Sequence, residues 1–485
     1  MSKLIKNTVI YSFSNIVTAL VSFVVFPIIS NKIGVSELGI YNLMQTLSSV
    51  LIIIIGLSLE KSLYILYYDS VVIEDKGKFA GTLLLSMLVF GFFIILLCVL
   101  CRNIIIGFLN INIISICVVL TIIYTYLQNI FLFFQTLNQI NQKALRYVIF
   151  SLILMLIVNV SNIVSIFYFD PSVNSLIYST FIAYIIITPL AIVYGKKYIV
   201  LKFDKRYLLH ALKCSIPMLF SVLFVWMFSM SDRLFISRYT SSTAVGLYAI
   251  GAKFASIITL FSAALFQAYQ PVFFEISNTM EMEASKSKLK KINNILCLLI
   301  SFAFLLVVLY GKHVLNYFFS ETYYDSFLYI YVLSIAAWII QISGLYNLMI
   351  YQRKKTVGIS MCGVMAGVIS VCLNVILLPI FGAKFAAINN LIVSFCIIIS
   401  VFFLAKRAFY IPLPMKSLLL VFVVCLISGG IDMSSVSVCC QLVIKTLLLM
   451  LFLYIVYCYK FFSFEFNVIF QIFKNDVFSS CSSFP

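Results

Sequence analysis

Six charged side chains lie within or at the ends of long apolar segments, where a charge is costly and usually serves a function. They are Glu60, Lys61, Asp232, Arg233, Lys253 and Lys445. Lys253 lies among small residues, seven positions after Gly246, which places it about 10 Å below the start of its expected helix. An ammonium at that depth could hold an anionic group such as a phosphate. Snorkelling to the outer interface accounts for Lys253 equally well.

The other five residues lie close to the ends of expected spans. Asp232 and Arg233 are neighbours, and adjacent residues point in different directions on a helix. Arg233 offers a guanidinium fork for phosphate or sugar oxygens, or it anchors a helix end. Asp232, Glu60 and Lys61 are candidates for ion coupling or gating, with solvation at the interface as the alternative for Glu60. Lys445 is a weaker candidate, beside a groove for lipid.

Sequence patterns of known catalytic chemistry are absent. There is no Walker A sequence, no HExxH and no arrangement of Ser, His and Asp that stands out. Two histidines and thirteen cysteines without zinc-like spacing predict no metal site. We therefore expect neither an enzyme nor a cofactor, and any energy has to come from a gradient or from the membrane potential.

The elements that position these charges must be helices in a lipid bilayer. Hydrophobic residues make up 63% of the 485, charged residues 10%, and the mean hydropathy is +1.14. A spanning helix needs about 20 mostly apolar residues and satisfies its own backbone hydrogen bonds. The sequence predicts an all-α polytopic protein of about 14 spans. They lie near 7–30, 39–60, 79–101, 111–134, 146–169, 174–194, 213–236, 246–274, 291–311, 325–348, 357–380, 383–405, 413–431 and 439–459.

The net charge of +17 follows the topology and does not indicate a nucleic-acid partner. With the N-terminus in the cytoplasm, about 25 of the 33 Lys and Arg residues fall on the inner side and about six on the outer side. This positive-inside bias predicts a multi-pass protein with both termini in the cytoplasm.

An internal repeat divides the spans into two sets of six. Ile29-Ser30 through Gly39-Ile40-Tyr41 matches Ile236-Ser237 through Gly246-Leu247-Tyr248 at an offset of 207 residues, and Asn162 matches Asn374 at 212. Because six is even, the repeat is parallel, with a pseudo-twofold axis along the membrane normal. We expect one six-helix lobe in 1–205, a second in 206–410, and two extra helices with a cytoplasmic tail in 411–485.

Three segments resemble the polysaccharide and O-antigen flippases of the Wzx type, whose superfamily also contains multidrug-and-toxin extruders and lipid II flippases. They are Ser231-Asp232-Arg233-Leu234-Phe235-Ile236-Ser237 continuing to Lys253-Phe254-Ala255, Leu373-Asn374 through Phe381-Gly382, and Asn31 through Tyr41. The resemblance covers essentially the whole chain, but its motifs are degenerate.

The resemblance implies a two-lobed flippase of the bacterial inner membrane. The substrate would be an oligosaccharide repeat unit on undecaprenyl diphosphate, for O-antigen or capsule, moved from the cytoplasmic to the periplasmic leaflet by alternating access. Lys253 and Arg233 match the cationic cavity positions of the family, and spans 13 and 14 would flank a path for the polyprenyl tail. A polysaccharide polymerase of the same pathway is the expected protein partner.

Other functions remain open. A cation-coupled multidrug antiporter of the same superfamily needs a membrane-buried carboxylate, and we expect no clearly buried acid, with none deeper than Glu60 in the first lobe. A glycosyltransferase or polymerase would need a large periplasmic loop, whereas the longest expected outer loops lie near 231–245 and 311–325. The twin lobes argue against a scaffold without transport activity.

Overall fold

The computed structural model describes residues 3–69, 72, 75–111, 113–353, 356–432 and 437–458. Within those ranges the fold is all-α and contains no strand. Fourteen of the described helices are long and apolar enough to cross a membrane, as predicted. The expected cytoplasmic tail lies outside the described residues.

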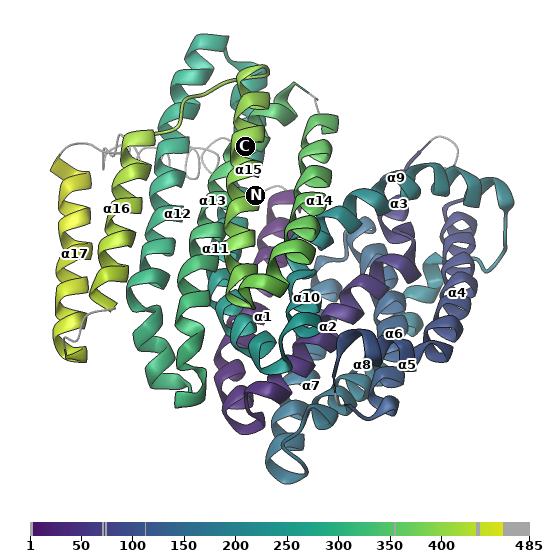
Figure 1. Cartoon of the computed structure of the whole chain (residues 1–485). Helices are drawn as coiled ribbons and strands as arrows, with labels where there is room; N and C mark the ends of the chain where they lie inside the picture. Colours follow the sequence, from purple (N-terminus) through teal and green to yellow (C-terminus); the bar gives the residue numbers. More distant parts are fainter. Residues whose placement is uncertain are drawn as a thin grey trace. The chain divides into compact units, whose positions relative to one another are not determined.

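The contacts between residues divide the chain into two compact units (Figure 1). Unit 2 comprises residues 7–249 and 363–386, and unit 1 comprises 1–6, 250–362 and 387–485. The division falls inside continuous helices: near the start of α1 (Lys3–Ile33) and of α15 (Lys384–Lys406), and within α11 (Ser242–Thr279) and α14 (Thr356–Phe381). The lobe boundaries expected at residues 205 and 410 stay a prediction.

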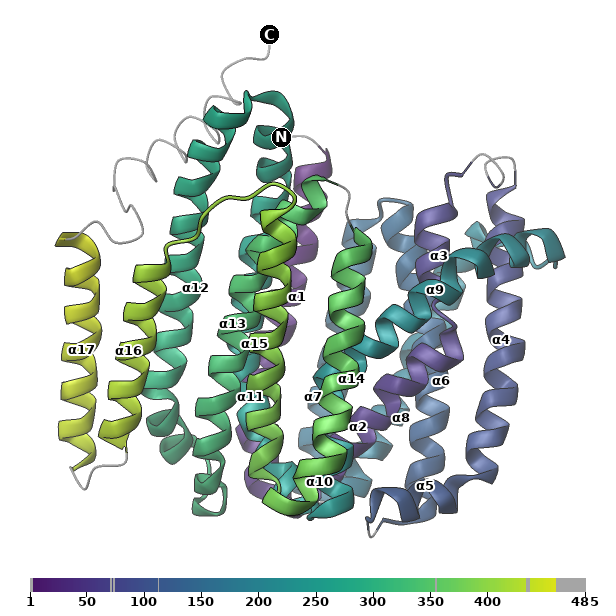
Figure 2. The same cartoon turned by 45° about the horizontal axis from the view of Figure 1, so that its top comes forward.

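Unit 2 is built mainly from ten helices in sequence. They are α1 (Lys3–Ile33), α2 (Val35–Gly56), α3 (Leu59–Leu66), α4 (Lys76–Leu100), α5 (Arg102–Leu109), α6 (Ser115–Ile140), α7 (Ala144–Tyr168), α8 (Val173–Gly195), α9 (Lys205–Met230) and α10 (Asp232–Tyr239). Helix α8 packs against α6 and α7, and the ring of Phe134 fills the space over Gly195, where an added Cβ would lie 2.2 Å from it. Figure 2 shows the first turns of α9 passing beside α3 and α4.

Unit 1 is built around α12 (Met282–Phe318) and α13 (Phe327–Gln352). Phe304 stacks on Trp338 at 5.0 Å between ring centroids, and the Trp338 Nε1 donates to Ser301 Oγ at 3.0 Å. Helix α15 (Lys384–Lys406) and the two C-terminal helices α16 (Met415–Asp432) and α17 (Val438–Cys458) complete the unit. Both views show α17 beside α16 at the edge of unit 1 (Figures 1 and 2).

Two expected spans end in a separate short helix instead of continuing. The span expected over 213–236 breaks after Met230, where the Ser231 hydroxyl donates to the Met227 carbonyl, and α10 starts at Asp232. The span expected over 39–60 ends at Gly56, because Leu57 and Ser58 adopt left-handed φ angles of 47° and 53°. These breaks place Asp232 and Arg233 on α10, and Glu60 and Lys61 on α3.

Candidate functional site

A buried polar cluster of unit 2 surrounds the carboxylate of Asp232, whose side chain is only 1% exposed. The Tyr248 hydroxyl donates to its Oδ2 at 2.6 Å, and the Asn374 Nδ2 donates to its Oδ1 at 2.7 Å. The cluster thereby joins α10, α11 and α14. Two donated hydrogen bonds favour the charged form of a carboxylate, so the site can keep a negative charge inside the protein.

Arg233 lies beside the same tyrosine on the neighbouring position of α10. Its guanidinium carbon lies 5.9 Å from the centroid of the Tyr248 ring, which is within range of a cation–π interaction. One Nη donates to the Met230 sulfur at 2.8 Å, and Nε is buried without a hydrogen-bond partner among the described residues. The half-buried guanidinium therefore retains donor capacity for an anionic ligand.

The first copy of the repeat has a related polar cluster without the acid. Tyr41, the counterpart of Tyr248, interacts with the side chains of Asn162, Thr180 and Gln45. The offset of 207 places the apolar Val25 at the position of Asp232. A comparison of the two copies could thus have identified Asp232 as the charge that distinguishes the second from the first.

The two copies of the repeat meet at a pair of glycines. A Cβ on Gly39 would lie 1.8 Å from the Ser242 carbonyl oxygen, and a Cβ on Gly246 would lie 2.1 Å from the Val35 carbonyl oxygen. The hydroxyl oxygens of Ser36 and Ser242 are 2.8 Å apart at the same crossing. No larger residue fits at either glycine, so this close approach explains why both copies contain one.

Glu60 and Lys61 lie away from α10, on the short helix α3. Gly56 leaves room for the Glu60 carboxylate, because a Cβ there would lie 3.3 Å from Glu60 Oε2 and 2.6 Å from Asn129 Oδ1. Burial raises the pKa of the Glu60 carboxyl, while its own backbone N–H and the charge of Lys61 act in the opposite direction. Glu60 can therefore bind a proton more readily than an exposed glutamate.

Lys253 belongs to unit 1 and is half-buried on α11. Two residues earlier, Gly251 packs so tightly against α13 that a Cβ would lie 2.5 Å from the Tyr329 Cβ. Positions two apart on a helix differ by about 200°, so Lys253 points away from the face of α11 that packs against α13.

Lys445 is fully buried at 0% exposure and forms an ion pair that the sequence analysis missed. Its Nζ donates to both carboxylate oxygens of Asp432, at 2.7 and 2.8 Å, and to the Leu309 carbonyl at 2.8 Å. The Lys312 Nζ donates to the Asp432 carbonyl at 2.5 Å. The ammonium of Lys445 thus binds protein atoms of α12 and α16, and in this structure it does not line an open groove.

The expectation that no acid is clearly buried is wrong, because Asp232 and Asp432 are only 1% and 6% exposed. Asp232 lies near the outer end of the span expected over 213–236, and Asp432 directly follows the span expected over 413–431. Hydropathy predicts that side chains at such span ends are solvated. The signal for Asp432 was its position 13 residues before Lys445 across a short loop, which allows the two helices to pair their charges.

Three comparisons relate the chain to known proteins. A protein of the Lsg locus of Haemophilus influenzae is 23% identical over 425 residues, which cover 84% of this chain and 98% of that protein. The solved inward closed structure of the lipid II flippase MurJ superposes with a TM-score of 0.73 at 16% identity, covering 93% of this chain and 99% of that one. An outward-facing multidrug resistance MATE transporter of the MOP superfamily gives a TM-score of 0.57 at 12% identity, covering 83% and 95%.

The two structural likenesses concern the fold alone. Residues 4–277, more than half of the chain, match the family described as polysaccharide biosynthesis protein. The chain is therefore a multi-pass membrane protein that belongs to the polysaccharide biosynthesis protein family.

Proposed function

We propose that this protein is a flippase for undecaprenyl-diphosphate-linked oligosaccharide repeat units of O-antigen or capsule. It would move them from the cytoplasmic to the outer leaflet of the bacterial inner membrane by alternating access, with both termini in the cytoplasm. Family membership supports a role in polysaccharide export, and the fold of a lipid II flippase covers 93% of the chain. The MATE transporter structure covers 83% of the chain. The part of the chain that the flippase structure covers in addition is about as long as α16 and α17 together.

The observation that carries this proposal is the arrangement around Arg233. A diphosphate cannot cross hydrocarbon without compensation of its charge, and a guanidinium binds phosphate oxygens through two parallel hydrogen bonds. Arg233 has a buried Nε without a partner among the described residues, and the ring of Tyr248 supports its guanidinium. In the proposed mechanism Arg233 binds the diphosphate, Lys253 adds positive charge, and Asp232 couples or gates the movement.

The charge of Asp232 also gives the second candidate function its support. A cation-coupled multidrug antiporter needs a buried carboxylate, and Asp232 provides one in a chain whose fold resembles a multidrug transporter. The flippase is favoured because Arg233, beside this carboxylate, would repel a cationic drug. A flippase for a diphosphate needs the positive charge at position 233, whereas an antiporter for cationic drugs is hindered by it.

Complementation tests the proposal. The chain is expressed in a strain that lacks its O-antigen flippase but still builds and ligates the polymer, and surface polysaccharide is displayed as a gel ladder. We expect the wild-type chain to restore the ladder, Arg233→Gln to lose it and Arg233→Lys to keep part of it. Arg238→Gln is the matched control, because Arg238 is an exposed arginine of the same short helix that donates to the Gly107 carbonyl.

One result would contradict the role of Arg233, and another would contradict the flippase itself. The first is a full ladder from Arg233→Gln at normal expression, which would remove Arg233 from the substrate site. The other is drug resistance conferred by the wild-type chain without any ladder in the deletion strain of its own gene, which would favour the antiporter. Lys253→Glu and Lys253→Arg extend the test, with loss expected from the first and activity from the second.

A further inference from the structure

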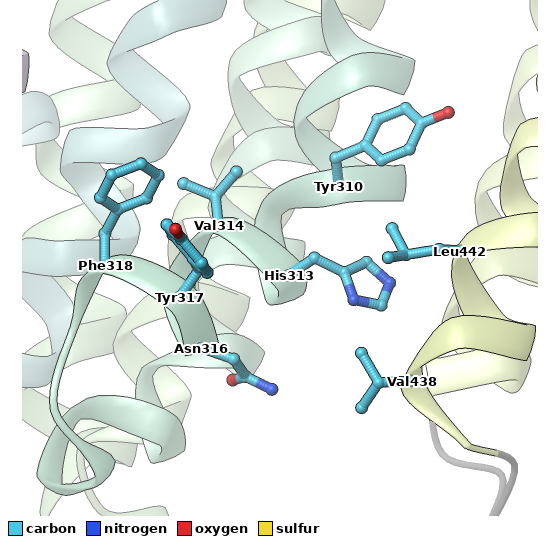
Figure 3. Close-up of a pocket in the computed structure, with 8 residues that line it drawn as sticks. All are labelled: Tyr310, His313, Val314, Asn316, Tyr317, Phe318, Val438 and Leu442. Carbon is cyan, nitrogen blue, oxygen red and sulfur yellow. The ribbon is translucent and has the colours of Figure 1, made fainter.

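A cavity of about 460 Å³ lies between α12 and α17 in unit 1 (Figure 3). Its α12 wall runs from Tyr310 to Phe318, and Val438 and Leu442 form the α17 wall. The volume is within the range of small-molecule pockets. Tyr317 and Phe318 at its end are 83% and 53% exposed, as aromatic residues are at the level of lipid headgroups.

His313 gives this mostly apolar cavity a polar group, alongside the Asn316 amide and the hydroxyls of Tyr310 and Tyr317. Figure 3 shows its imidazole extending from α12 toward Val438 and Leu442 on α17. Both ring nitrogens are buried and have no hydrogen-bond partner among the described residues. A neutral imidazole always carries one N–H donor and one acceptor nitrogen. Leaving them unpaired in an apolar site is unfavourable, so a ligand that supplies an acceptor oxygen would be stabilised here.

A fixed positive charge lies next to this donor. Lys312 and Lys445 both contact Asp432, at 3.8 and 2.7 Å, so two ammonium groups share one carboxylate and leave a net charge of one. All three groups interact electrostatically with His313. An anion beside His313 would compensate the remaining charge.

The lipid-facing side of α17 indicates which anion can reach the cavity. Helix α17 is at the edge of unit 1, and its outward side chains Leu447, Met450 and Tyr454 are each more than 60% exposed. In a membrane these side chains contact acyl chains. In a membrane the molecules that surround the cavity are therefore bilayer lipids.

We propose that this cavity binds an anionic glycerophospholipid of the surrounding bilayer. One acyl chain lies against Val314, Val438 and Leu442, and a phosphate oxygen accepts a hydrogen bond from His313. The lipid bridges α12 and α17. Its phosphate compensates the one positive charge that remains because Lys312 and Lys445 share the single carboxylate of Asp432. This site is separate from Arg233 and does not depend on the proposed function.

The chain contains only two histidines, so isotope labelling tests the proposal directly. The protein is labelled with ¹⁵N-histidine and held in maltoside micelles, which contain no phosphate, while phosphatidylglycerol is added. We expect the ring nitrogen signals of His313 to shift and saturate. The signals of His210, whose Nε2 lies 3.3 Å from Asp69 Oδ2, should stay in place as the internal control. An unchanged His313 signal would overturn the proposal.

Variants give a second readout by native mass spectrometry of bound lipid. We expect His313→Phe to weaken phosphatidylglycerol binding at least tenfold, His313→Gln to keep part of it, and His210→Phe to change nothing. If His313→Phe bound phosphatidylglycerol as tightly as the wild-type protein does, the assignment of His313 to the lipid site would be contradicted. If His313→Phe fails to fold, the titration of the wild-type protein decides alone. Tighter binding of undecaprenyl phosphate than of phosphatidylglycerol would overturn the choice of a bilayer phospholipid.

Discussion

Asn374 and Asp232 are 142 residues apart in the chain, yet the amide of Asn374 donates to the carboxylate of Asp232 at 2.7 Å. Both side chains are almost completely buried, at 0% and 1% exposure. This hydrogen bond holds the start of α10 against the second half of α14. It therefore fixes the helix that carries Arg233, the residue that we propose to bind the substrate.

Removing the amide tests that relationship. Asn374→Leu removes the hydrogen bond that the Asn374 amide donates to the buried Asp232 carboxylate, and we expect a loss of about 1–3 kcal/mol in the free energy of unfolding. Thermal unfolding in detergent measures it, with loss of the polysaccharide ladder as the second readout. Asn162→Leu is the matched control in the first copy of the repeat, where Val25 stands in place of the acid. Equal effects of the two substitutions would contradict a special role for Asp232.

A disulfide can test whether the crossing of α2 and α11 opens during transport. The Ser36 and Ser242 hydroxyl oxygens are 2.8 Å apart, close enough for cysteines at both positions to form an S–S bond of about 2.05 Å. We expect oxidation of Ser36→Cys/Ser242→Cys to abolish export and a reductant to restore it. Either single variant should be unaffected by oxidation. Full export from completely crosslinked protein would show that this crossing stays closed.

The ion pair of Lys445 and Asp432 should behave as a coupled unit. Among the described residues, Lys445→Met leaves the buried carboxylate with only the more distant Lys312 as an ion-pair partner, and breaking a buried pair costs about 3–5 kcal/mol. Adding Asp432→Asn removes the uncompensated charge and should recover most of that loss. A double-mutant cycle on thermal stability measures the coupling. Additive effects of the two substitutions would contradict it.

Glu60 predicts a pH dependence of stability. Burial raises its pKa above the unfolded value near 4.5, so the folded protein favours the neutral form. Stability should therefore fall as the pH rises from the unfolded pKa through the folded one, and Glu60→Gln should flatten that fall. Unfolding temperatures between pH 4 and 8 test this, with Glu275→Gln at an exposed position as the control. An unchanged profile in Glu60→Gln would contradict the assignment.

The spans were predictable because each is a long, mostly apolar run with few charges, which is what a helix needs to cross a bilayer. The repeat also predicted that Gly39 corresponds to Gly246 and Tyr41 to Tyr248, as equivalent positions of the two copies. Hydropathy did not predict the break at Ser231, since an apolar run gives no sign of a local change of direction. It also missed the burial of Asp432, whose partner Lys445 is on another helix. Contacts between distant helices, such as Asp232 with Asn374, leave no local pattern.

The glycine crossing of α2 and α11 is reciprocal. Gly39 lies against Ser242, and Gly246, at the position of Gly39 in the second copy, lies against Val35, at the position of Ser242 in the first. Such a reciprocal pattern is that of the isologous interface of a symmetric dimer. Within one covalent chain the two sides of such an interface need not be identical elsewhere, as Val25 and Asp232 show at equivalent positions.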